Sequence, residues 1–152
     1  RIEPEPLGTG GAVKLATGDV RGPFMVLNGD VFVDFDYPPI LAAHEPGHGL
    51  LVSGWKENNR DYGFLKIDGD RIREFIEKPS EPTSGLISVG CSILEPDHIR
   101  AVPGDSFMLE RDVYPRLAAE GRLKTVRHRG FFEDIGTEER LREIRQTLAG
   151  AE

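Results

Sequence analysis

Two short apolar segments restrict the folds open to this chain. Residues 24–27 read Phe-Met-Val-Leu and lie between Gly-Pro and Asn-Gly-Asp, and residues 49–55 read Gly-Leu-Leu-Val-Ser-Gly-Trp. Neither segment alternates apolar with polar side chains, and such continuous runs are typical of strands buried on both faces of a sheet. The two segments therefore favour a layered domain in which helices cover a central sheet.

Helical and extended patterns alternate along the rest of the chain. Residues 63–67 and 71–76 flank an Asp-Gly turn and predict a hairpin, which makes the sheet mixed. Residues 109–119 carry apolar side chains at helical spacing, and Gly121 follows as a stop signal. Strands that alternate with helices indicate an α/β fold. We also expect helices over residues 12–16, 39–44, 96–99 and 137–148, the last with Thr137 as its N-cap, and strands over residues 86–94 and 123–126.

The charge balance excludes several classes of function. The 152 residues include 19 basic and 26 acidic side chains, which gives a formal net charge of −7. Nucleic-acid binding needs clustered Lys and Arg, so we expect no nucleic-acid partner, although one Lys or a Mg²⁺ ion can still hold a small phosphorylated ligand. No apolar run approaches the roughly 18 residues of a membrane span and no leader-like segment is present, so we expect a cytoplasmic protein without a membrane partner. The single cysteine, Cys91, excludes an internal disulfide.

A glycine-rich turn precedes the first expected helix. Residues 8–11 read Gly-Thr-Gly-Gly. Glycines let the backbone approach a ligand closely, and the free N–H groups at a helix start favour an anion or a polar ligand. An ordinary turn before a helix explains the same residues. The pattern is not a P-loop, because no Gly-Lys-Ser/Thr follows, and it is not the dinucleotide fingerprint, because no sufficiently long strand precedes it.

Three further polar motifs follow expected strands. Asp30 ends the turn after the first strand, where a carboxylate is well placed for Mg²⁺ that bridges phosphate oxygens. Glu77 and Lys78 follow the hairpin; the lysine suits a phosphate, and the glutamate suits sugar hydroxyls. Asp134 precedes the last helix and is a second candidate metal ligand. Taken singly, each motif also fits a plain turn, a helix cap or a solvated charge pair.

The order of these motifs resembles the sugar-1-phosphate nucleotidyltransferases. The likeness extends from Glu3 to about Leu148, and it is greatest to the guanylyltransferases of D-glycero-α-D-manno-heptose 1-phosphate and of mannose 1-phosphate. The motifs that carry it are Pro-Leu-Gly-Thr-Gly-Gly at 6–11, Asn-Gly-Asp at 28–30, Tyr-Gly at 62–63, Glu-Lys-Pro at 77–79, Val-Gly at 89–90 and Asp-Ile-Gly-Thr at 134–137.

The resemblance implies a Rossmann-like, three-layer α/β fold with a mixed, mainly parallel sheet. It also implies a reaction in which a sugar 1-phosphate attacks the α-phosphorus of an NTP, releasing pyrophosphate and forming an NDP-sugar. Asp30 and Asp134 would hold the Mg²⁺ cofactor, with Asp30 and Lys78 as the catalytic pair. Lys78 would bind the sugar phosphate, while Glu77 and the backbone at Gly63 and Gly90 would hold the sugar hydroxyls.

The resemblance further implies where the base lies. Residues 6–8 would border it, with Glu3 beside them. A carboxylate accepts from both N1–H and the 2-amino group of guanine, so GTP is the expected nucleotide. Besides Glu3, Pro6, Leu7 and Gly8, the resemblance implies Thr9 and Gly29 as further substrate-binding residues.

The chain departs from the family pattern in one major respect. Members begin with a strand and a loop of the form Gly-Gly-x-Gly-x-Arg-Leu that holds the triphosphate, and this sequence contains no such loop. We therefore expect residues 1–152 to be the C-terminal two-thirds of a single nucleotidyltransferase domain, inactive alone, whose uncovered sheet edge favours a homo-oligomer. Two alternatives stay open: a non-catalytic subunit that binds a sugar nucleotide or regulates an enzyme, and a structural domain whose motifs arise by chance.

Overall fold

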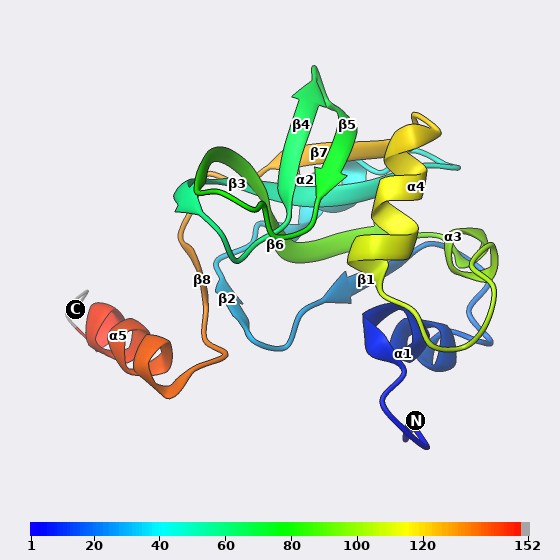
Figure 1. Cartoon of the computed structure of the whole chain (residues 1–152), viewed down its shortest axis with the longest axis horizontal. Helices are drawn as coiled ribbons and strands as arrows, with labels where there is room; N and C mark the ends of the chain where they lie inside the picture. Colours follow the sequence, from blue (N-terminus) through cyan, green and yellow to red (C-terminus); the bar gives the residue numbers. More distant parts are fainter. Residues whose placement is uncertain (150–152) are drawn as a thin grey trace.

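A mixed sheet flanked by helices forms the body of the structure, a computed structural model that describes residues 1–149; residues 150–152 of the predicted domain lie outside the described part (Figure 1). The elements are α1 (Gly8–Ala16), β1 (Phe24–Leu27), β2 (Val31–Val33), α2 (Tyr37–Ala42), β3 (Gly49–Asn59), β4 (Phe64–Asp68), β5 (Arg71–Ile76), β6 (Thr83–Leu94), α3 (Pro96–Arg100), the π-helix η1 (Leu109–Val113), α4 (Tyr114–Ala119), β7 (Leu123–Arg127), β8 (Phe132–Asp134) and α5 (Glu138–Ala149).

The main sheet has the strand order β1-β6-β3-β7-β5-β4, and β4 also pairs with β6. Within residues 1–149, β3 and β7 form the one parallel pair of this sheet, and its other pairs are antiparallel. The mixed sheet is confirmed, but the expectation that it is mainly parallel is wrong for this part of the chain. Parallel strands need a long crossover, and the connection from β3 to β7 supplies one that includes α3 and α4. The antiparallel strands β4 and β5 are instead joined by the short turn at Gly69 and Asp70.

Helices cover both faces of the sheet, so the predicted three-layer arrangement is confirmed. Successive side chains of β3 point to opposite faces. Leu51 packs with Ile99 of α3 and Leu117 of α4, and Val13 of α1 lies against the same cluster. Leu50 and Val52 point the other way and pack with Ile40 of α2. The apolar run over residues 49–55 is buried on both faces for this reason, except for the half-exposed Trp55.

A second, two-stranded sheet pairs β2 with β8 in antiparallel register, with Val31 opposite Asp134. The Ile135 N–H donates to the Asp30 carbonyl at 2.7 Å and extends this ladder beyond the strands. The small sheet packs on the main one where Phe132 lies against Gly54 of β3. Sequence patterns did not predict β2, because three residues are too few to display a period.

The ends of two predicted helices are confirmed. Thr137 accepts the N–H of Arg140 at 3.3 Å and caps α5. The helix predicted over residues 109–119 is present, although its first turn is the π-helix η1. Gly121 follows with φ +68°, the left-handed conformation in which glycine ends helices. None of the helices within residues 1–149 combines the length and the apolarity that a membrane crossing requires.

The contact at Gly54 yields a test of the junction between the two sheets. A Cβ on Gly54 would lie 2.3 Å from Cε1 of Phe132, so Gly54→Ala must displace that ring. We expect the free energy of unfolding in urea to fall by about 1–3 kcal/mol, the usual cost of overpacking. Gly22→Ala is the matched control, because a Cβ there has no neighbour within 4 Å. Equal stability of the two variants would contradict the packing described here.

Candidate active site

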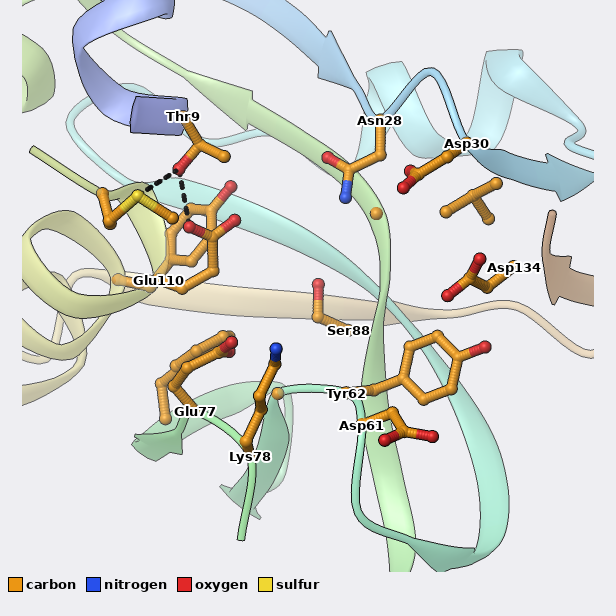
Figure 2. Close-up of a pocket in the computed structure, with 16 residues that line it drawn as sticks. Thr9, Asn28, Asp30, Asp61, Tyr62, Glu77, Lys78, Ser88, Glu110 and Asp134 are labelled. Carbon is orange, nitrogen blue, oxygen red and sulfur yellow. Dashed lines mark hydrogen bonds between the residues drawn. The ribbon is translucent and has the colours of Figure 1, made fainter. Parts of the chain in front are cut away.

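One cavity of about 260 Å³ gathers most of the polar motifs (Figure 2). It lies between the ends of β1 and β8, the loop before β4, the end of β5 and the start of η1. Of the residues predicted from the sequence, those that line it are Thr9, Asp30, Gly63, Glu77, Lys78, Gly90 and Asp134. Segments from one end of the chain to the other therefore meet at a single place.

Asp30 and Asp134 face the same small space. A Cβ on Gly136 would lie 3.0 Å from Oδ1 of Asp134 and 3.5 Å from Oδ2 of Asp30, so only glycine leaves that space open. Asp30 lies just before β2 and Asp134 ends β8, so the pairing of these strands sets their separation. Within residues 1–149 no group of three or more ligand side chains could hold a metal. Mg²⁺, however, commonly takes one or two protein carboxylates together with substrate phosphates, and this pair fits that pattern.

Lys78 is the basic residue of the cavity; no other described lining residue is basic. Its φ of +48° is left-handed, a conformation that costs a non-glycine residue of order 1–3 kcal/mol and is concentrated at functional sites. The backbone at this position directs the side chain towards the middle of the cavity, between Glu77 and the aspartate pair (Figure 2). An ammonium group held there can neutralise an anion that enters between the two sides.

Two further carboxylates, Glu77 and Glu110, lie on the side of the cavity opposite the aspartates (Figure 2). Burial raises the pKa of Glu77, and the charge of Glu110 raises it further, while Lys78 opposes both. Thr9 of α1 fixes Glu110: its hydroxyl donates to Oε2 at 2.6 Å and accepts the Leu109 N–H at 2.9 Å. This side of the cavity offers several acceptors that suit hydroxyl groups of a ligand.

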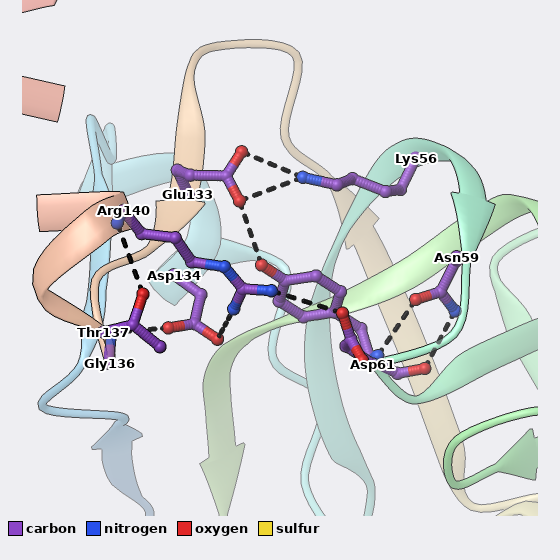
Figure 3. Close-up of polar contacts among 9 residues, drawn as sticks. Lys56, Asn59, Asp61, Glu133, Asp134, Gly136, Thr137 and Arg140 are labelled. Carbon is purple, nitrogen blue, oxygen red and sulfur yellow. Dashed lines mark hydrogen bonds and ion pairs between the residues drawn. The ribbon is translucent and has the colours of Figure 1, made fainter. Parts of the chain in front are cut away.

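The loop that carries Tyr62 is held by a polar network (Figure 3). The Asn59 side chain accepts the Tyr62 N–H and donates to its carbonyl, both at 2.9 Å. The Tyr62 hydroxyl donates to Glu133 at 3.1 Å, and Lys56 Nζ lies 2.9 Å from the same carboxylate. Burial raises the pKa of Tyr62, and Glu133 adds to the effect, so the phenol keeps its proton. These contacts fix the backbone of the adjacent Gly63 beside the cavity.

The four residues expected around the base, Glu3, Pro6, Leu7 and Gly8, lie outside this cavity. Leu7 lines a separate cavity of about 450 Å³ together with Arg1 and Lys14. Glu3, Pro6 and Gly8 line neither cavity, and the same is true of Gly29, which was predicted only as a substrate-binding residue. Thr9, also predicted only as a substrate-binding residue, does line the first cavity, where it contacts Glu110.

Several lining residues were not identified from the sequence. Asn28 lies in the same turn as Asp30, and this adjacency was a usable signal. Neither Glu110 nor Asp61 had a usable signal in the sequence, because an acidic residue on an amphipathic helix or in a loop is common. Tyr114 was expected only as part of a helix, yet it is buried and exchanges a 3.0 Å hydrogen bond with Ser92 below the cavity.

The raised pKa of Glu77 predicts a pH dependence of stability. The stability associated with Glu77 is fully present below the usual pKa of glutamate and is lost as pH rises through the raised value. Glu77→Gln cannot ionise, so we expect this variant to gain stability relative to the parent between about pH 3.5 and about pH 7.5. Urea unfolding at the two pH values measures this gain. The exposed Glu57→Gln is the control, and an equal gain in both variants would contradict the prediction.

Comparison with known proteins places this chain in a family. Residues 1–150 match the model of the family described as nucleotidyl transferase. The mannose-1-phosphate guanylyltransferase catalytic subunit beta of Danio rerio is 36% identical over 141 residues, which are 88% of this chain and 39% of the relative. The mannose-1-phosphate guanyltransferase of Saccharomyces cerevisiae is 32% identical over 143 residues, 89% of this chain and 40% of the relative. The chain thus spans about two-fifths of the length of these curated relatives.

A solved structure with a similar sequence also has the same fold as this chain. The crystal structure of HddC from Yersinia pseudotuberculosis superposes with a TM-score of 0.81 at 30% identity, and covers 97% of this chain and 65% of that one. The same values hold for HddC complexed with GMP-PN. The predicted resemblance and fold class are confirmed, and the chain belongs to the nucleotidyl transferase family.

Proposed function

We propose that the protein carrying this chain transfers a guanylyl group from GTP to a sugar 1-phosphate, either mannose 1-phosphate or a heptose 1-phosphate. The observation that carries the proposal is the convergence of Asp30 and Asp134 beside Lys78 in one cavity. The similarity to mannose-1-phosphate guanylyltransferases supports the sugar phosphate and the guanylyl group, and the GMP-PN complex of HddC supports a nucleotide ligand.

The chemistry brings two anions together. An oxygen of the sugar 1-phosphate forms a bond to the α-phosphorus of GTP, and the bond from that phosphorus to the bridging oxygen breaks, so pyrophosphate carries away the electron pair. The main task of the protein is to position both anions and to neutralise the charge as it shifts. Lys78 can do this for the sugar phosphate, because its ammonium group lies in the cavity between the two sets of carboxylates.

Asp30 and Asp134 would hold Mg²⁺ at the space that glycine leaves open at position 136. When bound, Mg²⁺ supplies positive charge against the phosphate oxygens. The two aspartates orient that charge, because β2 and β8 hold them from opposite strands of one ladder. The carboxylate pair would repel a phosphate group if no cation neutralised it. A Mg²⁺ ion bound by Asp30 and Asp134 would remove this repulsion.

The other predicted residues have complementary roles in the proposal. Glu77 would accept sugar hydroxyls, and the backbone at Gly63 and Gly90 would bind further ones beside it. On the nucleotide side, Glu3 would accept from guanine. The residues proposed to border the base with it are Pro6, Leu7 and Gly8, and Thr9 and Gly29 are proposed as further substrate-binding residues.

Turnover by the complete protein tests this function directly. With GTP, Mg²⁺ and either sugar 1-phosphate, we expect pyrophosphate release, and we expect Asp30→Asn or Asp134→Asn to slow it by about 10²–10³-fold through lost charge stabilisation. Asp36→Asn is the control, because this exposed aspartate lies outside the cavity. Absence of turnover with every NTP and sugar-phosphate pair would refute the proposal, and tight binding of a GDP-sugar without turnover would favour a non-catalytic subunit.

Lys78→Gln tests the phosphate contact separately. A hydrogen bond to a charged group is worth about 1.5–3 kcal/mol, so we expect KM for the sugar 1-phosphate to rise about 10–100-fold, with a smaller change in KM for GTP. Lys66→Gln, which removes an exposed lysine paired with Glu74 on the same hairpin, should leave both constants unchanged. Equal rises in the two KM values would argue against a specific contact between Lys78 and the sugar phosphate.

A further inference from the structure

Arg140, in the first turn of α5, joins two acidic residues that line the cavity. Its Nη1 lies 2.7 Å from Oδ2 of Asp134, and its Nη2 lies 3.2 Å from Oδ2 of Asp61 (Figure 3). The Asp134 side chain is 23% exposed and that of Asp61 is 67% exposed, so the first pair is the more shielded from water. The guanidinium thus bridges the end of β8 and the loop that carries Tyr62.

Both oxygens of Asp134 have donors in this arrangement. Oδ1 accepts the Gly136 N–H at 2.6 Å, and Oδ2 pairs with Arg140. The Asp30 carboxylate differs, because within residues 1–149 it has no hydrogen bond or ion pair through its side chain. Of the two proposed ligands of the cation, one is therefore already neutralised by a permanently charged side chain.

The position of Arg140 on α5 follows from a few adjacent residues. Thr137 caps the helix and accepts the Arg140 N–H, which orients the first turn towards Asp134. Further along α5, Ile144 is the one buried residue within the described part of the helix. The helix lies at the edge of the molecule beyond β8 (Figure 1). The ion pairs of Arg140 are therefore a main link between α5 and the cavity.

We propose that Arg140 is a positioning residue that competes with the divalent cation for Asp134 and thereby weakens cation binding at the proposed site. This inference rests on the proposed function, which assigns the cation to Asp30 and Asp134. A guanidinium on Oδ2 reduces the negative charge that a cation meets, since two positive groups share one carboxylate. When Asp134 binds a cation, Arg140 keeps a second partner, Asp61, so displacement from Asp134 does not leave the guanidinium unpaired.

The affinity of the complete protein for Mn²⁺, measured by electron paramagnetic resonance without any substrate, tests this competition. We expect Arg140→Gln to tighten Mn²⁺ binding about two- to fivefold, the range that corresponds to loss of a partly exposed ion pair. Arg140→Lys keeps a charge and should restore most of the parent affinity. Arg142→Gln is the matched control, because Arg142 lies on the same helix and donates only to the Glu138 carbonyl, at 3.2 Å.

Asp61→Asn is an independent test, in which the affinity for Mn²⁺ is expected to change in the opposite direction. Without the Asp61 carboxylate, Arg140 pairs with Asp134 alone and competes more strongly for it. We therefore expect Mn²⁺ to bind about two- to threefold more weakly. In the double variant with Arg140→Gln this effect should vanish, because the two residues act through one contact. Should Arg140→Gln fail to fold, as judged by circular dichroism, unchanged Mn²⁺ binding in Asp61→Asn would still overturn the competition.

The outcomes separate this inference from the proposed function. Unchanged or weaker Mn²⁺ binding in folded Arg140→Gln, while Asp134→Asn abolishes binding, overturns the competition and leaves the cation site intact. Unchanged Mn²⁺ binding in Asp134→Asn, or absence of binding by the parent protein, overturns the cation site and the competition together. Tighter binding in Arg140→Gln with rescue by Arg140→Lys supports the competition, because a merely structural role of Arg140 would not raise affinity.

Discussion

The antiparallel pairing of β2 with β8 is the interaction on which the site depends. It sets Asp134 opposite Val31, and the Ile135 N–H continues the ladder to the carbonyl of Asp30, so that two carboxylates distant in the sequence face one space. Strands of three residues are marginal by themselves, since each ladder hydrogen bond contributes about 0.5–1.5 kcal/mol net. The small sheet relies on Phe132 packed against Gly54, so core packing and carboxylate geometry are coupled.

The alternation of side chains along β8 links the two halves of the cavity. Glu133 points towards Lys56 and Tyr62 and so steadies the loop at Gly63, while Asp134 points the other way, towards Asp30 and Gly136. Burial by itself raises the pKa of Glu133, but the hydrogen bonds and charge of Lys56 lower it overall, so this carboxylate stays ionised. Two neighbouring residues of β8 thus fix the position of the proposed sugar side of the cavity relative to the proposed cation side.

The cavity departs from what stability alone would favour. Glu77 and Glu110 face each other, Lys78 adopts a left-handed backbone, and the aspartate pair keeps an open space at Gly136. Each feature costs free energy that the apolar layers around β3 and β6 must offset. Such departures are concentrated where a protein binds charged or hydroxylated ligands, and they are consistent with a site for a sugar phosphate and a nucleotide.

Local patterns in the sequence determined the elements, and tertiary structure decided their partners. The apolar runs at residues 24–27 and 49–55 and the stop at Gly121 predicted two strands and a helix end correctly. The prediction that residues 24–27 are buried on both faces was wrong, because β1 lies at the end of the strand order in the described part of the chain and is only partly buried. The mixed sheet and its hairpin were predicted correctly, but the expectation of a mainly parallel sheet was wrong for residues 1–149, because strand pairing joins segments far apart in the chain. The strand β2 was not predicted, because three residues show no period. The ion pair of Arg140 with Asp134 likewise had no local signal: an arginine in a first helical turn is ordinary until the folded chain brings carboxylates to it.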